Sequence, residues 1–229
     1  MDPGYDDYHA PRYAFLIRLL RELGATTNAT LLDVGRSTLT ARLREEFHIP
    51  VDSIGFGPDE TNTGGRHFEF DLNLAQSHQR WRTDLPAYRF VVMAEVLEHL
   101  HTAPQLVLAF VVTVLAKDGL LIVQTPNAAA VTKRVKLLLG RNPYEMLRPD
   151  LSDPGHYREY TVAELRQIGK GLGLREERCL TGFYFDARFA RHGPNGVYPQ
   201  PVIGAIKNAL YPLLPKSFRE GITMVWRKN

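Results

Sequence analysis

The chain has 229 residues, a net charge of +3, 44% hydrophobic and 23% charged residues. This composition is ordinary for one large globular domain, and so small a charge gives no argument for a nucleic-acid partner. The single cysteine, Cys179, excludes an internal disulfide framework and is expected to be a core or strand thiol. Residues 1–9 lack the features of a signal peptide, and the apolar stretches are too short to cross a membrane. We therefore expect a cytoplasmic protein.

The elements expected along the chain alternate between strand and helix after an N-terminal amphipathic helix within residues 10–24. This alternation predicts one domain over residues 1–229, with a parallel sheet that has helices on both faces. We expect strands at residues 30–34, 51–56, 67–70, 88–93, 120–125, 174–180 and 222–227, and further helices at 39–47, 102–115, 128–139 and from Thr161.

Two regions interrupt the alternation. Residues 140–160 contain three prolines, and residues 182–221 are rich in aromatics, glycine and proline. A long connection without its own secondary structure is usually functional, so we interpret both as lid or partner-binding insertions, and the second can equally form a homodimer contact. The apolar run 206–214 favours a helix packed on the domain over contact with a lipid-like substrate or a membrane surface.

Polar residues stand where several predicted strands end. Strand 30–34 carries Asp33 next to its last residue and is followed by Gly35, and the segment after strand 88–93 contains Glu95, Glu98 and His99. In open α/β sheets, ligands bind outside the carboxyl ends of the strands. If residues 95–99 begin a helical turn, these three side chains share one face. A solvated helix start also explains the two acids, but it explains the adjacent histidine less readily.

The segments Leu32–Gly35, Glu95–His99, Thr125–Asn127 and His156–Thr161 resemble those of class I S-adenosylmethionine (SAM) dependent methyltransferases, the ubiquinone-biosynthesis O-methyltransferases above all. Similar spacing occurs in small-RNA 3′-terminal 2′-O-methyltransferases. The resemblance implies a doubly wound, mostly parallel, seven-stranded Rossmann-like sheet. It also implies an antiparallel last strand, an inserted lid and SAM as the cofactor.

The resemblance also assigns the cofactor side of the site, with two departures from the family pattern. Arg36 and the residues after it replace two expected glycines, and Gly57 stands where the family has an acid that binds the ribose. Phe56 is expected against the adenosine, and Asp71 against the adenine amino group, although an aspartate here is also a common turn former. The cofactor residues are predicted to be Asp33, Gly35, Arg36, Ser37, Phe56, Gly57, Asp71, Leu72 and Glu95.

The relatives use two glutamates and two histidines to bind a divalent metal, which here implies Glu95, Glu98, His99 and His156. Such a set suits Mn²⁺, Fe²⁺ or Zn²⁺ better than Mg²⁺, and metal binding is a hypothesis. Without a metal, His99 or His156 is the expected general base, since an imidazole titrates near neutral pH. The predicted catalytic residues are Glu98, His99 and His156.

These residues predict a SAM-dependent O-methyltransferase that acts on a hydroxyl of a small molecule, with a sugar or glycan first and a phenolic or quinone-like compound second. RNA 2′-O-methylation by the same four residues is the alternative within the enzyme class. The sequence shows no appended RNA-binding module, which disfavours this alternative. A non-catalytic SAM-binding protein is the third hypothesis, which the altered glycine loop favours and the intact Glu95–His99 segment disfavours.

Overall fold

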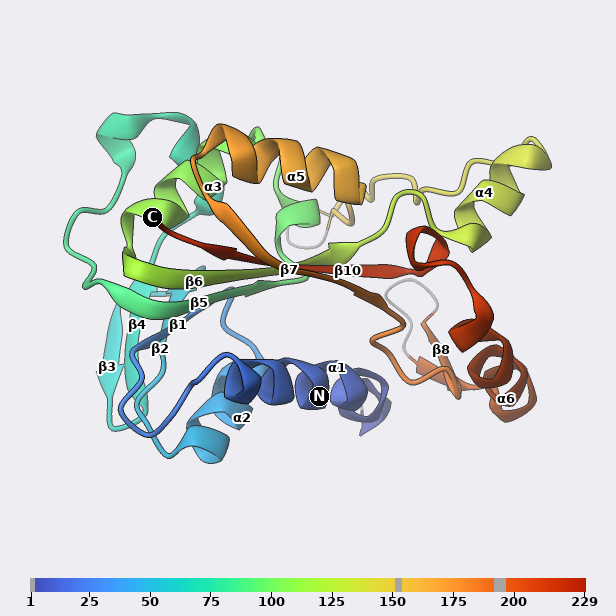
Figure 1. Ribbon diagram of the computed structural model, residues 1–229, viewed down its shortest axis with the longest axis horizontal. Helices are drawn as coiled ribbons and strands as arrows, with labels where there is room; N and C mark the ends of the chain where they lie inside the picture. Colours follow the sequence, from blue (N-terminus) through green and yellow to red (C-terminus); the bar gives the residue numbers. More distant parts are fainter. Residues whose placement is uncertain (1–2, 151–153, 192–196) are drawn as a thin grey trace.

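The computed structural model describes residues 3–150, 154–191 and 197–229. Its centre is an eight-stranded sheet in the order β3-β4-β2-β1-β5-β6-β10-β7 (Figure 1). β1, β2, β4, β5 and β6 run parallel, whereas β10 lies antiparallel between β6 and β7. The strands are β1 Leu31–Val34, β2 Asp52–Gly55, β3 Glu60–Asn62, β4 Gly65–Glu69, β5 Tyr88–Ala94, β6 Leu115–Pro126, β7 Arg175–Gly182 and β10 Gly221–Arg227.

The sheet contains all seven predicted strands with the antiparallel last strand, and it adds the short edge strand β3. Helices cover both faces: α1 and α2 lie on one, α3 and α5 on the other (Figure 1). Buried aliphatic and aromatic residues separate each helix layer from the sheet in two core clusters. The α-helices are α1 Pro3–Glu22, α2 Thr38–Phe47, α3 Pro104–Thr113, α4 Val131–Leu138, α5 Val162–Gly171 and α6 Pro201–Leu210.

The N-terminal helix α1 begins well before residue 10, where the sequence pattern predicts its start, and it contains Pro11. Tertiary contacts explain the extension. The Tyr8 ring stacks on the Phe185 ring with centroids 4.8 Å apart, and the Asp186 backbone N–H donates to the Tyr8 carbonyl at 2.9 Å. The first turns of α1 are therefore held by a segment about 180 residues away in sequence, which local periodicity does not reveal.

The region 182–221 is not the structureless connection that its composition suggests. It holds a two-stranded hairpin, with β8 Phe189–Arg191 paired to β9 Val197–Pro199. The helix α6 and two 3₁₀ turns, η5 Tyr211–Leu213 and η6 Lys216–Phe218, follow the hairpin. The other interruption, 140–160, has no helix or strand longer than one bridge in its described part, as its prolines predict.

Candidate functional site

The site begins where β5 ends. Glu95 has a left-handed backbone with φ of 56°, which is unusual for a residue with a side chain. Its N–H donates to the Gln124 carbonyl of the neighbouring strand at 2.8 Å. The chain then forms the 3₁₀ turn η3, Leu97–His99, with Leu97 and Glu98 buried. The predicted helical turn is present, but the strained Glu95 backbone precedes it instead of belonging to it.

Glu98 is a fully buried carboxyl group at the centre of the site. The Thr125 hydroxyl donates to its Oε2 at 3.0 Å, while no described residue hydrogen-bonds to its Oε1. Burial raises the pKa of Glu98 well above its usual range, and the charge of nearby Glu95 raises it further. A buried acceptor without a donor is costly, so this oxygen is suited to a proton or a cation.

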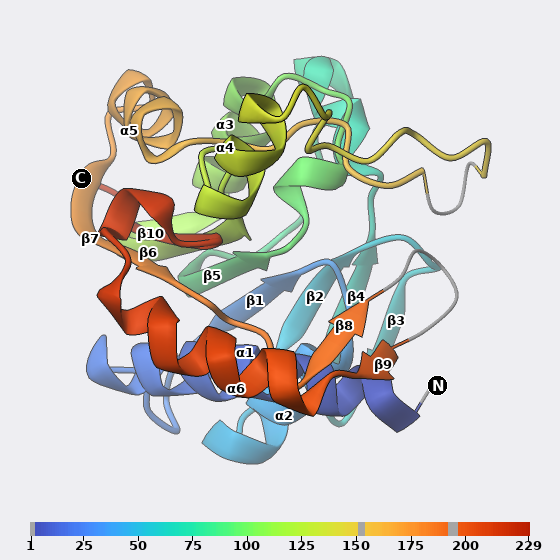
Figure 2. The same cartoon turned by 90° about the vertical axis from the view of Figure 1, so that its right-hand side faces the viewer.

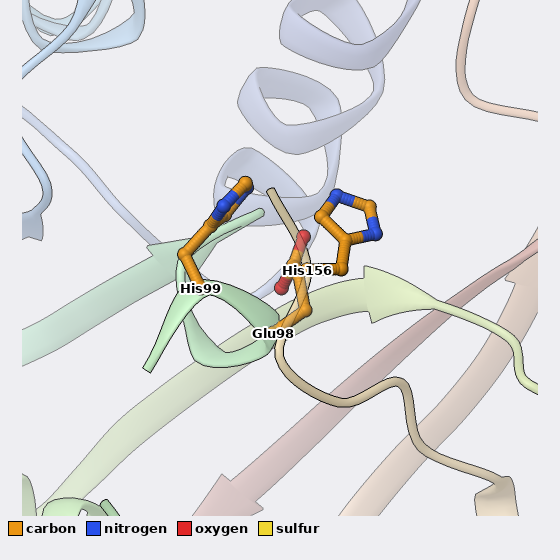
Figure 3. A group of neighbouring side chains, drawn as sticks. All are labelled: Glu98, His99 and His156. Carbon is orange, nitrogen blue, oxygen red and sulfur yellow. The ribbon is translucent and has the colours of Figure 1, made fainter. Parts of the chain in front are cut away.

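Two histidines stand beside Glu98, and the second comes from a distant loop (Figure 3). The rings of His99 and His156 lie edge to face with centroids 4.7 Å apart. Backbone bonds hold the loop in place, since the Tyr157 N–H donates to the Glu98 carbonyl at 2.8 Å. His99 Nδ1 lies 3.0 Å from the Gly155 carbonyl. A carbonyl only accepts, so Nδ1 carries the proton and the lone pair of this imidazole is on Nε2.

Two further charged residues support His156, and sequence reasoning missed both. His156 Nδ1 lies 3.3 Å from Glu159 Oε1, and the Lys133 ammonium forms an ion pair with the same carboxylate. Lys133 also donates to the Asn127 carbonyl at 3.1 Å, and burial lowers its pKa to about 8. Glu159 lies inside the family-like segment His156–Thr161, and its position three residues after His156 is a signal that sequence reasoning did not use.

The ligand atoms of Glu98, His99 and His156 all lie within 4.8 Å of one another. We call these three residues the acceptor cluster. The donor set fits a divalent cation: it offers one carboxylate oxygen and two imidazoles, and both imidazoles make Nδ1 hydrogen bonds of the kind that orient metal-binding histidines. Glu95, the fourth predicted ligand, is not in this group.

A cavity of about 250 Å³ adjoins the acceptor cluster at the carboxyl ends of β1, β2 and β5. We call it the cofactor pocket. Five of the predicted cofactor residues line it, namely Gly35, Arg36, Phe56, Leu72 and Glu95, together with His99 of the acceptor cluster. Sequence reasoning missed the other lining residues, Gly55, Phe70, Asn73, Val96 and Leu100.

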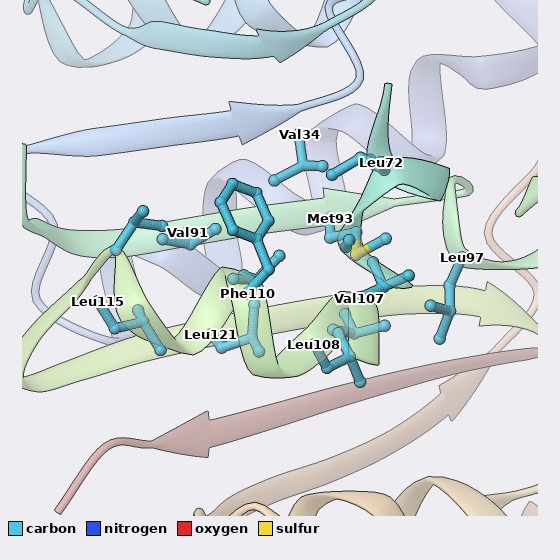
Figure 4. Packing of buried hydrophobic residues seen from close by; sticks show 14 of the residues in the cluster. Val34, Leu72, Val91, Met93, Leu97, Val107, Leu108, Phe110, Leu115 and Leu121 are labelled. Atoms are coloured by element: carbon cyan, nitrogen blue, oxygen red, sulfur yellow. The ribbon is translucent and has the colours of Figure 1, made fainter. Parts of the chain in front are cut away.

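Gly35 is required where β1 leaves the sheet. Its φ is 86°, and an added Cβ would lie only 2.7 Å from Val96 Cγ2, so a larger residue would push the two loops apart. Beneath them, Leu72 lies beside Val34 and Met93 in the core (Figure 4). The floor of the cofactor pocket is thus fixed by packing.

The other predicted cofactor residues lie outside the lining of the cofactor pocket, and three of them have clear structural roles. The buried Asp33 accepts a hydrogen bond from the Thr40 hydroxyl at 2.6 Å, and burial raises the pKa of Asp33 to about 7. Ser37 caps α2 in a capping box with Thr40. Asp71 accepts from the Asn73 backbone N–H at 2.9 Å and so begins a 3₁₀ turn, as the turn-forming alternative predicts.

An arginine occupies the neighbourhood of the missing ribose acid. A Cβ added to Gly57 would lie 3.4 Å from Arg36 Nη2. Arg36 Nη1 donates to Glu60 at 2.9 Å, and Asp59 forms an ion pair with Arg82 at 2.7 Å. The two acids that follow Gly57 are therefore both held by arginines.

Arg12 of α1 is a buried cation that sequence reasoning did not single out. It is 4% exposed, and its Nε and Nη1 atoms hydrogen-bond to no described residue. Its guanidinium lies 5.6 Å from the centre of the Phe185 ring. The positive charge of Arg12 lowers the pKa of Asp33 and of Glu98, although burial raises both by more, so Arg12 lies near both carboxyl groups. A buried cation without a hydrogen-bonded anion is a candidate receptor for an anionic ligand group.

A model of the methyltransferase domain family matches residues 8–177, which include the cofactor pocket and the acceptor cluster. No curated protein matches the sequence. Solved structures support the fold. A SAM-dependent methyltransferase from Archaeoglobus fulgidus is 15% identical, with a TM-score of 0.55, and the match covers 94% of each chain.

Two further solved structures contain S-adenosylhomocysteine. The 1,6-didemethyltoxoflavin N1-methyltransferase of Burkholderia thailandensis is 18% identical over 99% of this chain and 81% of its own, with a TM-score of 0.56. The magnesium protoporphyrin IX methyltransferase of Synechocystis PCC 6803 is 10% identical over 100% and 89%, with a TM-score of 0.56. At these identities the likeness concerns the fold alone.

Proposed function

This chain belongs to the methyltransferase domain family and is a SAM-dependent enzyme, and from that premise we propose that it methylates a hydroxyl oxygen of a small molecule. A sugar or glycan is the first candidate acceptor, and a phenolic or quinone-like compound is the second. The observation that carries the proposal is the acceptor cluster beside the cofactor pocket. His99 belongs to both, so a hydroxyl at the cluster is close to a methyl donor in the pocket.

Proton removal is the step for which an alcohol needs such a cluster. The attacking hydroxyl oxygen forms a bond to the SAM methyl carbon while the bond from that carbon to sulfur breaks, and the hydroxyl proton must leave. His156 suits the role of base, because its Nδ1 faces the Glu159 carboxylate and its lone pair is then on Nε2. The product imidazolium is stabilised by the same carboxylate.

The acceptor cluster also fits a divalent metal, with Glu98, His99 and His156 as its ligands. A bound cation would supply Lewis-acid lowering of the acceptor hydroxyl pKa. Burial raises the pKa of Glu98 and so disfavours its ionised form. A cation bound beside Glu98 would favour the ionised carboxylate and offset this effect, which supports the metal form of the proposal. In either form, His99 keeps its orientation through the Gly155 carbonyl.

The cofactor end of the proposal depends on the pocket and on Arg12. Gly35 permits close approach of the backbone, and Phe56, which is 76% exposed, is available to cover the adenosine. Glu95 lines the same pocket and is a candidate for the cofactor's polar end. Arg12 suits the cofactor's own carboxylate, since its guanidinium is buried with donors that no described residue satisfies.

Calorimetric titration with SAM and with S-adenosylhomocysteine tests the cofactor part directly. Titration with Mn²⁺ and Zn²⁺, in the wild type and in Glu98→Gln, tests the metal form separately. We expect cofactor binding to be retained in Glu98→Gln and metal binding to be lost. Cofactor binding without any metal signal assigns the cluster to the histidine-base form.

Acceptor screening then tests the reaction. Hydroxylated sugars and phenols are incubated with SAM, and each product is analysed by mass spectrometry for the position of the new methyl group. Methylation at oxygen supports the proposal. Methylation only at nitrogen acceptors overturns it but leaves the family membership unchanged.

A further inference from the structure

Two segments of the described chain expose aliphatic side chains to solvent. The first is α4 with the residues after it, and the second is α6 with η5. Leu138 is 86% exposed, Leu213 is 79% exposed and Val202 is 72% exposed. The other exposed aliphatic residues of these segments are Val135, Leu137, Leu139, Ile203, Ile206 and Leu210.

The helix α6 packs on the domain by its small side and turns its large side chains outward. Gly204 lies against the residues just before β8, where an added Cβ would meet the Ala187 carbonyl oxygen at 2.6 Å. Ile203, Ile206 and Leu210 are each more than half exposed, and their spacing places them on one face. A surface helix normally buries its apolar face, so α6 has the reverse orientation. Similarly, no residue of α4 is buried.

Every charged residue in these two segments is basic. Residues 131–141 and 201–219 contain seven of the 28 basic residues of the chain and none of its 25 acidic residues, so the rest of the chain is net acidic. Lys133 is paired with Glu159, Arg134 donates to the Ala129 carbonyl and Arg219 donates to the Thr181 carbonyl, whereas Lys136, Arg141 and Lys216 are exposed to an external partner. The seven are Lys133, Arg134, Lys136, Arg141, Lys207, Lys216 and Arg219.

The two segments form one face of the molecule. Figure 2 views the domain from the side on which both α4 and α6 lie toward the reader. The Arg134 guanidinium lies 4.7 Å from the centre of the Phe218 ring of η6, and Arg134 and Lys216 both line a cavity of about 830 Å³ whose other walls come mainly from α5 and β7. We call residues 131–141 and 201–219 the apolar–basic face.

We propose that the apolar–basic face docks on a membrane surface that contains anionic lipids. Aliphatic side chains enter the boundary of the acyl chains while lysine and arginine side chains bind the anionic headgroups. The described helices include none that is long and apolar enough to cross a membrane, so the domain would lie on the surface. Single-stranded RNA is a poorer fit, because such interfaces stack bases on aromatic side chains and the exposed large residues here are mostly aliphatic.

Two side chains link the apolar–basic face to the acceptor cluster. Lys133 lies in the first turn of α4 and is paired with Glu159, which in turn contacts His156. The face and the cluster are therefore joined by two side chains. The lipid-binding proposal itself does not depend on the proposed reaction, since it rests on exposure and charge alone.

Vesicle co-sedimentation of the full chain tests the proposal. Vesicles of phosphatidylcholine alone are compared with a two-to-one mixture of phosphatidylcholine and phosphatidylglycerol, at low and high salt. We expect binding to the mixed vesicles only, and weaker binding at high salt. Each basic residue removed from the face should lower the partition coefficient about fivefold. Two double variants are compared with the wild type. Leu138→Glu with Ile206→Glu removes two exposed aliphatic side chains, and Lys136→Glu with Arg141→Glu removes two basic ones. Both should bind the mixed vesicles more weakly.

Lys117→Glu is the matched control, because this exposed lysine lies near the start of β6, at the opposite end of this strand from α4. It should sediment like the wild type, and circular dichroism confirms that each variant folds. Absence of binding to both vesicle types overturns the proposal. So does an oligomer of the wild type that dissociates in Leu138→Glu with Ile206→Glu, because the face then binds a second copy. An RNA oligonucleotide that binds through the basic residues, without need of Leu138 and Ile206, overturns it as well.

Discussion

The acceptor cluster and the cofactor pocket occupy the same edge of the sheet but are built by different means. The cluster consists of side chains with internal partners: Thr125 bonds to Glu98, and Glu159 bonds to His156. The pocket is shaped by the backbone turn at Gly35, which has a left-handed φ, and by the packed floor at Leu72, and its lining residue Phe56 is largely exposed.

This difference implies different responses to mutation. In the acceptor cluster, a single side chain carries a chemical role, so its loss should affect turnover more than binding. In the cofactor pocket, the shape of the cavity carries the role, so changes at glycine positions should matter more than removal of exposed polar groups. The predictions below test this contrast, from the largest expected effect to the smallest.

The largest effect is expected from His156→Gln. Loss of a general base lowers kcat/KM by about 10²–10³-fold, while the dissociation constant of SAM changes by less than about twofold because His156 does not line the cofactor pocket. Steady-state kinetics with the best acceptor and calorimetry measure the two quantities. His101→Gln is the matched control, since this exposed histidine lies outside the acceptor cluster. Equal losses in both variants would contradict the assignment.

Asp33→Asn should change the pH dependence of stability. Burial raises the pKa of Asp33 to about 7, so the folded state binds this proton more tightly than the unfolded state. The wild type therefore loses stability as pH rises from about 4 to about 7, by about 3 kcal/mol as an order of magnitude. The variant lacks this loss and gains on the wild type over the same interval. Urea unfolding at several pH values measures the difference, and parallel curves would be evidence against the buried ionisation.

Gly35→Ala should lower the free energy of unfolding by about 2 kcal/mol, because the new Cβ meets Val96 and the backbone is left-handed. It should also weaken SAM binding, since both residues line the cofactor pocket. The control is Gly171→Ala in α5, where an added Cβ has no described atom within 4 Å. There we expect a slight stabilisation, of less than about 1 kcal/mol. Chemical denaturation compares the two variants, and equal effects would refute the steric argument.

Arg12→Met retains the apolar stem of the side chain and removes its charge. We expect the dissociation constant of SAM to rise about tenfold, as for the loss of one charge-assisted hydrogen bond. Arg18→Met is the control, because Arg18 is exposed on the same helix. Calorimetry at constant salt distinguishes the two. An unchanged affinity in Arg12→Met would assign this buried cation to folding instead of binding.

The smallest effect is expected from Glu60→Gln. Its partner Arg36 and Glu60 itself are both about half exposed, and exposed ion pairs contribute little. The dissociation constant of SAM should change by less than about twofold. A tenfold increase would mean that Glu60 replaces the missing ribose acid, and would place a side-chain contact in the pocket whose role we attribute to the shape of the cavity.

Much of this architecture could be predicted from local pattern. The alternation of apolar runs with amphipathic segments predicts seven strands, and Thr161 with Glu164 predicts the capping box at the start of α5, which the structure contains. Strand ends carry Gly35 and Glu98, so the edge that holds the site was predictable too. Local hydrogen bonding and periodicity act over a few residues, and the sequence displays them directly.

Long-range contacts could not be predicted in the same way. The sequence alone determined the sheet, its helices and the edge on which polar residues gather. Only the tertiary structure decided that Glu159 supports His156, that Arg12 is buried near Glu98, and that α6 turns its apolar side outward. These facts depend on which segments meet in space. Burial and pairing are properties of the packed chain, and a residue's neighbours in sequence do not specify them.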